Sequence, residues 1–170
     1  LYVSGVQLET GVVANKLNLI MNPGFEYCTN NVPDNWTFSG TATKSVVTSE
    51  RGRCAALTGD IEKNVSCMQG VSISGQEGDI FHLSCWVKGL GIPGKQFSIS
   101  AAVIYSDDSV KWHHFKCNPN INGWQFVNNT FSTDDEGEST KKAYKAIHVY
   151  LMCYNQANQI LFKGVQLIKD

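Results

Sequence analysis

The sequence has little charge and no excess of either sign. Charged residues make up 17% of the 170 residues, and 14 basic side chains against 15 acidic ones leave a formal net charge of -1. Binding to a phosphate backbone or an anionic membrane surface needs an excess of positive charge. The chain also lacks an apolar stretch of about 18 residues, the length that spans a bilayer. We therefore expect no nucleic-acid partner and no insertion into a membrane.

Helical periodicity is also missing, whereas the alternation typical of strands is clear. Apolar and polar residues alternate from Asp79 to Lys88 and from Tyr144 to Cys153, and a period of two places successive side chains on opposite faces of a strand. Turn-forming residues separate further predicted strands at 97–105, 110–117, 124–131 and 159–167. Many short antiparallel strands in about 170 residues predict an all-β fold, a two-sheet antiparallel β-sandwich with jelly-roll topology.

The two alternating segments each have one purely apolar face, which we assign to the core. The opposite faces carry His82 and Trp86 in one segment and Tyr144, His148 and Tyr150 in the other. An aromatic and polar surface of this kind is typical of a binding site. The alternative is that a loop or a neighbouring module covers it.

The two ends of the chain resemble each other. Residues 1–8 align with residues 160–167, and Gly5 to Leu8 are identical to Gly164 to Leu167. A repeat whose period is close to the chain length predicts that residues 1–10 are the last strand of a preceding repeat, 11–17 a linker, and 18–170 one complete module. The parent protein would then be larger, with neighbouring repeats as partners. Chance similarity between two strand-like segments is the alternative.

Six cysteines are present, and no pair has the C-x-x-C spacing. Cys85 and Cys153 fall on the apolar faces of the two alternating segments, where a free cysteine behaves as a small hydrophobic residue. We therefore expect buried thiols rather than a framework of disulfides.

Several short segments, taken in their order along the chain, resemble the carbohydrate-binding modules of families 4, 9 and 22. These segments are Asn18–Glu26, which resembles the opening strand, Pro33–Trp36, Arg51–Leu57, Phe81–Lys88, Gly123–Gln125 and Leu161–Leu167. The closing Gly-Val-Gln-Leu also looks like modules found in tandem in bacterial cell-surface proteins of the RHS/YD-repeat type. The resemblance implies a galactose-binding-like, lectin-like sandwich that holds glycans without cleaving them, in an extracellular or cell-surface protein.

Members of this family commonly hold a structural calcium ion, and the resemblance places Glu26 and Glu50 at two ligand positions. Lys163 stands where the family has an Asp in the last strand. Calcium needs six to eight oxygen ligands and is repelled by an ammonium group. We therefore expect no cofactor, with Lys163 neutralising both carboxylates. If calcium is present, its ligands would be Glu26 and Glu50 together with Gly24 and Arg53.

Sugar recognition needs a flat aromatic platform with polar groups around it. Trp86 is the first candidate platform, with His148 as its polar neighbour on the same sheet face, and Trp112 lies in a polar stretch as a second platform. The remaining candidate ligand-binding residues are Tyr105, Tyr150 and His82. Trp36 and Trp124 lie beside turns, at positions that the resemblance assigns to the core.

No arrangement of residues predicts catalysis. The acidic residues at 107–108 and 134–136 lie in loops, and nothing indicates the burial that would raise the pKa of a glycosidase acid. We expect a module that is not an enzyme and binds a polysaccharide or glycan. The alternative is a structural spacer or a protein–protein adhesion module with no sugar ligand.

Overall fold

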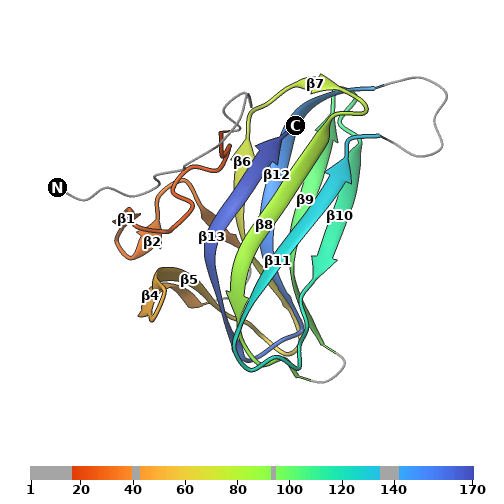
Figure 1. Cartoon of the computed structure of the whole chain (residues 1–170). Coiled ribbons are helices and arrows are strands. Elements are labelled where there is room, and N and C mark those ends of the chain that lie inside the picture. The colour runs from red at the N-terminus through yellow and green to blue at the C-terminus, as the bar shows by residue number, and fades with distance from the viewer. Residues whose placement is uncertain (1–16, 40–42, 93–94, 135–141) are drawn as a thin grey trace, which may run out of the picture.

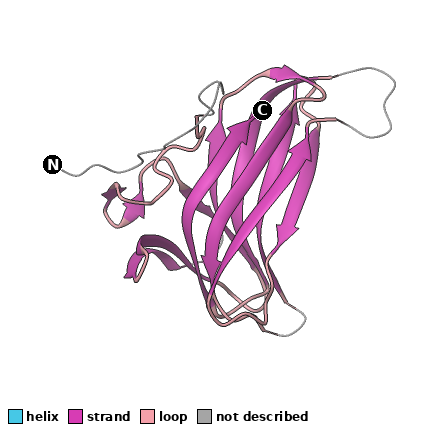
Figure 2. Cartoon of the chain, viewed as in Figure 1, coloured by secondary structure: helices cyan, strands magenta, loops and turns pink. Residues whose placement is uncertain are grey.

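The computed structural model describes residues 17–39, 43–92, 95–134 and 142–170. This part of the chain forms thirteen strands and contains no helix (Figure 2). Two antiparallel sheets pack face to face with the core between them (Figure 1). The expected all-β sandwich is therefore confirmed.

The six-stranded sheet has the order β10-β9-β12-β6-β3, and β7 pairs with the start of β12. Its strands are β3 (Thr37–Ser39), β6 (Asn64–Val71), β7 (Gly75–Gln76), β9 (Gln96–Tyr105), β10 (Val110–Lys116) and β12 (Ala143–Tyr154).

The five-stranded sheet has the order β11-β8-β13-β5-β4. Its strands are β4 (Thr43–Ser49), β5 (Gly52–Thr58), β8 (Ile80–Lys88), β11 (Trp124–Ser132) and β13 (Gln159–Lys169). A short hairpin of β1 (Cys28–Thr29) and β2 (Val32–Pro33) lies outside both sheets, above the β4–β5 pair in Figure 1.

All six strands predicted from the sequence are present, as β8 to β13, with ends that shift by no more than two residues. The segment Asn18–Glu26 does not form the opening strand that the family resemblance suggests. It runs beside β13 instead, where the Leu19 amide donates to the Leu167 carbonyl and the Val165 amide donates to the Pro23 carbonyl. A bulge in β13 between Lys163 and Gln166 interrupts pairing with β8 at this point.

The predicted core faces are confirmed. Phe81, Leu83, Cys85 and Val87 have no exposed surface, and neither do the alternate residues of β12 from Ile147 to Cys153. Tyr144 was expected on the outer face with His148, but it is buried. A register shift between Tyr144 and Ala146 reverses the alternation at the start of β12 and turns this ring into the core.

The cysteine prediction is also confirmed. All six thiols are free, five of them are buried, and Cys28 is partly exposed. Among the described residues, no helix has the length and apolar character needed to cross a membrane. The predicted repeat remnant at residues 1–10, and the linker up to residue 16, lie outside the described part of the chain.

Sheet assignment decides how the predicted site is arranged. Trp86 is in β8 of the five-stranded sheet, whereas His148 is in β12 of the six-stranded sheet. Because the apolar alternate residues of both strands meet in one core, the outward residues of the two strands point to opposite sides of the sandwich. The prediction that Trp86 and His148 share one sheet face is therefore wrong.

Candidate functional site

Aromatic side chains gather on the outer side of the six-stranded sheet. In β10, Trp112 lies opposite Ala102 of the central strand β9, and Ala102 lies opposite His148 of β12. One row along, His114 and Tyr150 flank Ser100 in the same way. Because the outward side chains of β9 are small here, rings from β10 and β12 can meet above it. We call the side chains of Trp112, His114, His148, Tyr150 and Tyr154 the aromatic face.

Ring distances show that the aromatic face is continuous. The Trp112 ring centroid lies 4.9 Å from that of Tyr150, which belongs to a strand on the far side of β9. Trp112 is also stacked on His114, with centroids 5.4 Å apart and an interplanar angle of 6°. His148 lies 6.4 Å from Tyr150. Trp112 keeps 43% of its surface exposed. His114 is exposed as well, whereas His148 and Tyr150 are partly buried.

Polar groups accompany these rings. The Nδ1 atom of His114 lies 3.1 Å from the Ser100 hydroxyl and 3.2 Å from the Tyr154 hydroxyl, while the Ser100 hydroxyl lies 3.1 Å from that of Ser98. These contacts hold the imidazole parallel to the Trp112 ring. The Tyr150 phenol is protonated at neutral pH and able to donate a hydrogen bond, and burial raises its pKa further.

The five-stranded sheet carries a second aromatic cluster on its outer side. The guanidinium carbon of Arg51, in the β4–β5 turn, lies 3.7 Å from the Trp86 ring centroid. Phe126 of β11 lies 5.0 Å from Trp86 and keeps 51% of its surface exposed. The predicted platform at Trp86 is thus partly covered by a cation–π contact.

Trp124 belongs to this cluster and not to the core, which corrects the sequence-based assignment. It lies opposite Lys88 in the β11–β8 register, and its indole donates to Glu50 at 2.8 Å. Lys88 also contacts Glu50, at 2.6 Å. Hydrogen bonds from Lys88 and Trp124, together with one from the backbone, lower the pKa of Glu50 to about 2. Trp36, by contrast, is buried as predicted and packs 5.2 Å from Phe25.

Two other predicted ligand residues have protein partners. His82 lies on the outer side of the five-stranded sheet, where its Nε2 is 2.9 Å from Asp170 and its Nδ1 is 2.9 Å from the Thr130 hydroxyl. Both imidazole nitrogens are therefore in contact with other side chains. Tyr105 is fully buried, and its hydroxyl donates to the Thr133 carbonyl at 2.7 Å. Tyr105 is a core residue, so its prediction as a surface platform is wrong.

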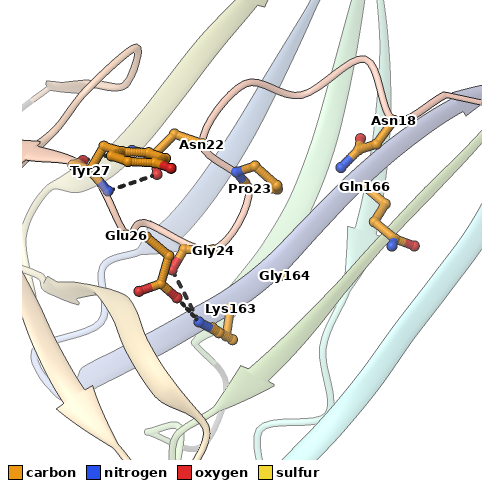
Figure 3. A pocket seen from close by; sticks show the side chains of 9 residues that line it. All are labelled: Asn18, Asn22, Pro23, Gly24, Glu26, Tyr27, Lys163, Gly164 and Gln166. Atoms are coloured by element: carbon orange, nitrogen blue, oxygen red, sulfur yellow. Dashed lines mark hydrogen bonds and ion pairs between the residues drawn. The ribbon is translucent and has the colours of Figure 1, made fainter. Parts of the chain in front are cut away.

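A hollow of about 460 Å³ lies between the 18–27 segment and β13 (Figure 3). Lys163 enters it from β13 and donates to the Gly24 carbonyl at 3.1 Å and to the Glu26 carboxylate at 2.8 Å. The expected ion pair with Glu26 is confirmed. Glu50 pairs with Lys88 instead, so Lys163 does not bring the two carboxylates together.

These contacts do not fit a calcium site. The ammonium group of Lys163 contacts both Gly24 and Glu26, two of the four candidate ligands, and the third, Glu50, is engaged elsewhere. Arg53, the fourth candidate, lies opposite Thr48 in the β5–β4 strand register. Across the described ranges, no group of three or more His, Cys, Asp or Glu side chains is placed to hold a metal ion.

Local backbone geometry places Glu26 beside Lys163. Asn22 and Phe25 have φ angles of 49° and 60°, in the left-handed region that is costly for Phe. The Asn22 side chain holds the loop by donating to the carbonyls of Tyr27 and Asp34 and accepting from the Tyr27 amide. Complete burial of Phe25 against Trp36 offsets the strain.

Sequence reasoning missed His114, Tyr154 and Arg51. Alternation through 110–117 contained the signal for His114, because Trp112 and His114 are two residues apart and so share a face. Tyr154 extends the outward series of β12 by one more position. No local pattern indicates that Arg51 covers Trp86, since the contact joins a turn to a strand 35 residues later.

One sequence-family model matches most of the chain. The sequence model of the family described as "Carbohydrate binding domain" (CBM_4_9) matches residues 17–150. No curated protein matches the chain in sequence at a significant level.

Similar solved structures are carbohydrate-binding modules or larger proteins that contain a comparable fold. The CBM22-1 xylan-binding domain of Xyn10C from Paenibacillus barcinonensis has a TM-score of 0.64 and 12% identity, over 93% of this chain and 97% of that one. TmCBM61, solved in complex with β-1,4-galactotriose, has a TM-score of 0.55 and 16% identity, over 91% and 99%. The enzymatically active domain of bacteriophage CBA120 tailspike protein 4 has a TM-score of 0.69 and 13% identity. That match covers 90% of this chain but only 21% of the tailspike chain.

Proposed function

We propose that this chain, which belongs to the family of carbohydrate-binding domains, holds a glycan on the aromatic face of its six-stranded sheet. The observation that carries the proposal is the pair formed by Trp112 and Tyr150, whose rings meet across β9 while the indole stays 43% exposed. An aromatic surface edged by hydroxyl and imidazole groups matches a sugar, which has C–H patches on its faces and hydroxyls around its rim.

Binding would combine stacking with hydrogen bonds on a surface that is already formed. Trp112 provides the open platform, and His148 and the Tyr150 hydroxyl provide polar groups beside it. Each aromatic contact contributes about 1 kcal/mol beyond the area it buries. A few such contacts give a dissociation constant in the micromolar to millimolar range, which corresponds to a binding free energy on the order of −8 to −4 kcal/mol.

The same face supports binding without cleavage. Glycosidases place two carboxyl groups on either side of the scissile bond. The six strands of this sheet, all of them described, contain no Asp or Glu. Any carboxylate pair that acted on a glycan bound there would have to come from outside this sheet. We therefore infer a non-catalytic module.

We further propose that the chain is part of a larger exported bacterial protein at the cell surface, of the RHS/YD-repeat type, with neighbouring repeats as partners. Similarity between residues 1–8 and 160–167 supports a tandem arrangement. Glycan binding by such a module would keep the larger protein close to the polysaccharide that the module binds.

Calorimetric titration against a glycan panel tests the binding site. The panel contains xylan and β-1,4-galactan, and the proteins are the wild type, Trp112→Ala and Trp86→Ala. We expect Trp112→Ala to weaken binding by about five- to tenfold, equivalent to the loss of one stacking contact. Trp86→Ala is the matched control on the other sheet and should leave the affinity unchanged.

Equal affinity in wild type and Trp112→Ala, with loss in Trp86→Ala, would move the site to the five-stranded sheet and restore Trp86 as the platform. No binding to any glycan would instead support the alternative of a spacer or protein adhesion module. Circular dichroism of each variant checks that the fold is retained.

A further inference from the structure

Two lysines at one end of the aromatic face have no described carboxylate partner. Lys116 follows Trp112 and His114 on the outer side of β10 and is exposed. Lys95 precedes β9 and, with Gln96 and Tyr154, helps line a hollow of about 370 Å³. On the opposite side of the sandwich, by contrast, Lys88 is paired with Glu50.

The lysines lie in line with the stacking platform. Lys116 is opposite Ser98, one row beyond the row of His114, and Gln96 is opposite Tyr154 in the next row. Trp112 and Lys116 are four residues apart on one strand, which corresponds to roughly 14 Å. A polymer stacked on Trp112 and running along β10 would therefore pass the ammonium groups of Lys116 and Lys95.

Nearby carboxylates lie outside this track. At the far end of the sheet, Asp107 and Asp108 in the β9–β10 turn are paired with Lys142 and Lys145. At the lysine end, the turn before β6 carries Asp60, Glu62 and Lys63, and β6 is separated from β9 by β12. The carboxylates at the far end are thus neutralised by ion pairs with lysines. The negative charge of the carboxylates at the lysine end is offset in part by Lys63.

We propose that the glycan bound by the aromatic face is acidic, a polymer of sugars that carry carboxylates. This inference rests on the proposed function. A sugar ring stacks on Trp112 and Tyr150, while carboxylates on following residues accept charge-assisted hydrogen bonds from Lys116 and Lys95. A neutral glycan offers these two ammonium groups only hydroxyl acceptors, which bind them more weakly than carboxylates do, so cations beside the platform favour a polyuronate.

The test compares an acidic glycan with its neutral methyl ester. Polygalacturonate and its fully methyl-esterified form share a backbone, and alginate provides a second polyuronate, with xylan and β-1,4-galactan as neutral controls. We expect the wild type to prefer polygalacturonate over the esterified form. Raising the salt from about 0.05 M to about 0.5 M should reduce that preference, because exposed charges are screened within a few ångströms at high salt.

The variant Lys116→Gln tests whether this positive charge contacts the acidic glycan. Exposed ion pairs are weak, so we expect this variant to bind polygalacturonate about two- to fivefold less tightly, and Lys95→Gln/Lys116→Gln to lose more. Arg51→Gln is the matched control, because it removes one positive charge from the other side of the sandwich and should leave the affinity unchanged. Binding to the esterified polymer should be the same in all variants.

The possible outcomes bear differently on the proposal of glycan binding and on the proposal of an acidic ligand. Binding of neutral glycans as tight as that of both polyuronates overturns the acidic ligand but leaves glycan binding intact. If no glycan in the panel binds, both proposals are wrong. A loss in Arg51→Gln but not in Lys116→Gln places the acidic ligand at Trp86 and overturns the present site. Equal capture of a DNA oligonucleotide would show non-specific anion binding and would also contradict the proposal.

Discussion

The Arg51 guanidinium lies over the Trp86 ring at 3.7 Å, and this contact joins the β4–β5 turn to β8, two strands away from β5 in the five-stranded sheet. Arg51 is also 5.5 Å from the Trp124 ring. No described carboxylate pairs with this guanidinium in a salt bridge, so its contacts are mainly with aromatic faces. The turn is thus held against β8 and β11 by cation–π attraction and side-chain packing.

Arg51→Ala should destabilise the fold modestly. Exposed cation–π pairs contribute about 0.5–1 kcal/mol, so we expect the free energy of unfolding to fall by that amount in urea denaturation. Lys116→Ala is the control, since Lys116 is exposed and lacks a described salt bridge. An equal loss in both variants would show that the Arg51 contact adds no stability.

Lys163 should make the stability independent of calcium. We expect the melting temperature of the wild type to be the same in EDTA and in millimolar calcium, because the Lys163 ammonium already contacts Gly24 and Glu26. Lys163→Asp replaces the cation with a carboxylate near Glu26. We expect its melting temperature to rise with calcium, with a gain of roughly 1.4 kcal/mol at ten times the dissociation constant. A calcium-dependent wild type would contradict this account.

The hydrogen bond from Tyr144 to Asp79 should contribute stability that depends on pH. The Tyr144 hydroxyl and the Lys169 ammonium contact the same carboxylate oxygen, at 2.7 and 2.6 Å. Burial alone would raise the pKa of Asp79, but these hydrogen bonds outweigh it and lower the pKa. Because the pKa is lower in the folded state, the stabilisation is complete above the unfolded value of about 3.9 and is lost as the pH falls through the folded value.

Tyr144→Phe removes this hydrogen bond but keeps the buried ring. We expect a loss of about 1 kcal/mol at pH 7, and the difference from the wild type should shrink as the pH falls through the lowered pKa of Asp79. Urea denaturation at several pH values measures both. In the Asp79→Asn background the effect of Tyr144→Phe should not vary between pH 2.5 and pH 7. A constant difference in the wild-type background would show that Asp79 is not the titrating group.

The buried thiols should be unreactive in the folded protein. Burial raises the pKa of Cys117 and Cys153 to about 12, and the thiolate is the reactive form. With a water-soluble disulfide reagent, we expect Cys28 alone to react in native buffer and six thiols to react in guanidinium chloride. Cys28→Ser should abolish the native reaction. Rapid labelling of more than one thiol would indicate local opening of the sandwich.

Alternation in the sequence was enough to assign the cores of β8 and β12, because a period of two is a property of each strand alone. It did not indicate which sheet each strand joins, so Trp86 and His148 were placed together although they lie on opposite sides. The same limit explains Tyr144, whose face is reversed by a bulge that only the pairing with β9 reveals. It also explains Trp124, whose position opposite Lys88 places it on the outer side.

By itself, the sequence determined the all-β class, six strand positions, the buried thiols and the family. These properties depend on local patterns and on the order of short motifs along the chain. Tertiary structure alone decided that Trp112 meets Tyr150, that Arg51 covers Trp86 and that Glu50 pairs with Lys88 rather than with Lys163. Such contacts join residues far apart in the chain, and hydrogen bonding between strands, which sets sheet order and register, brings them together.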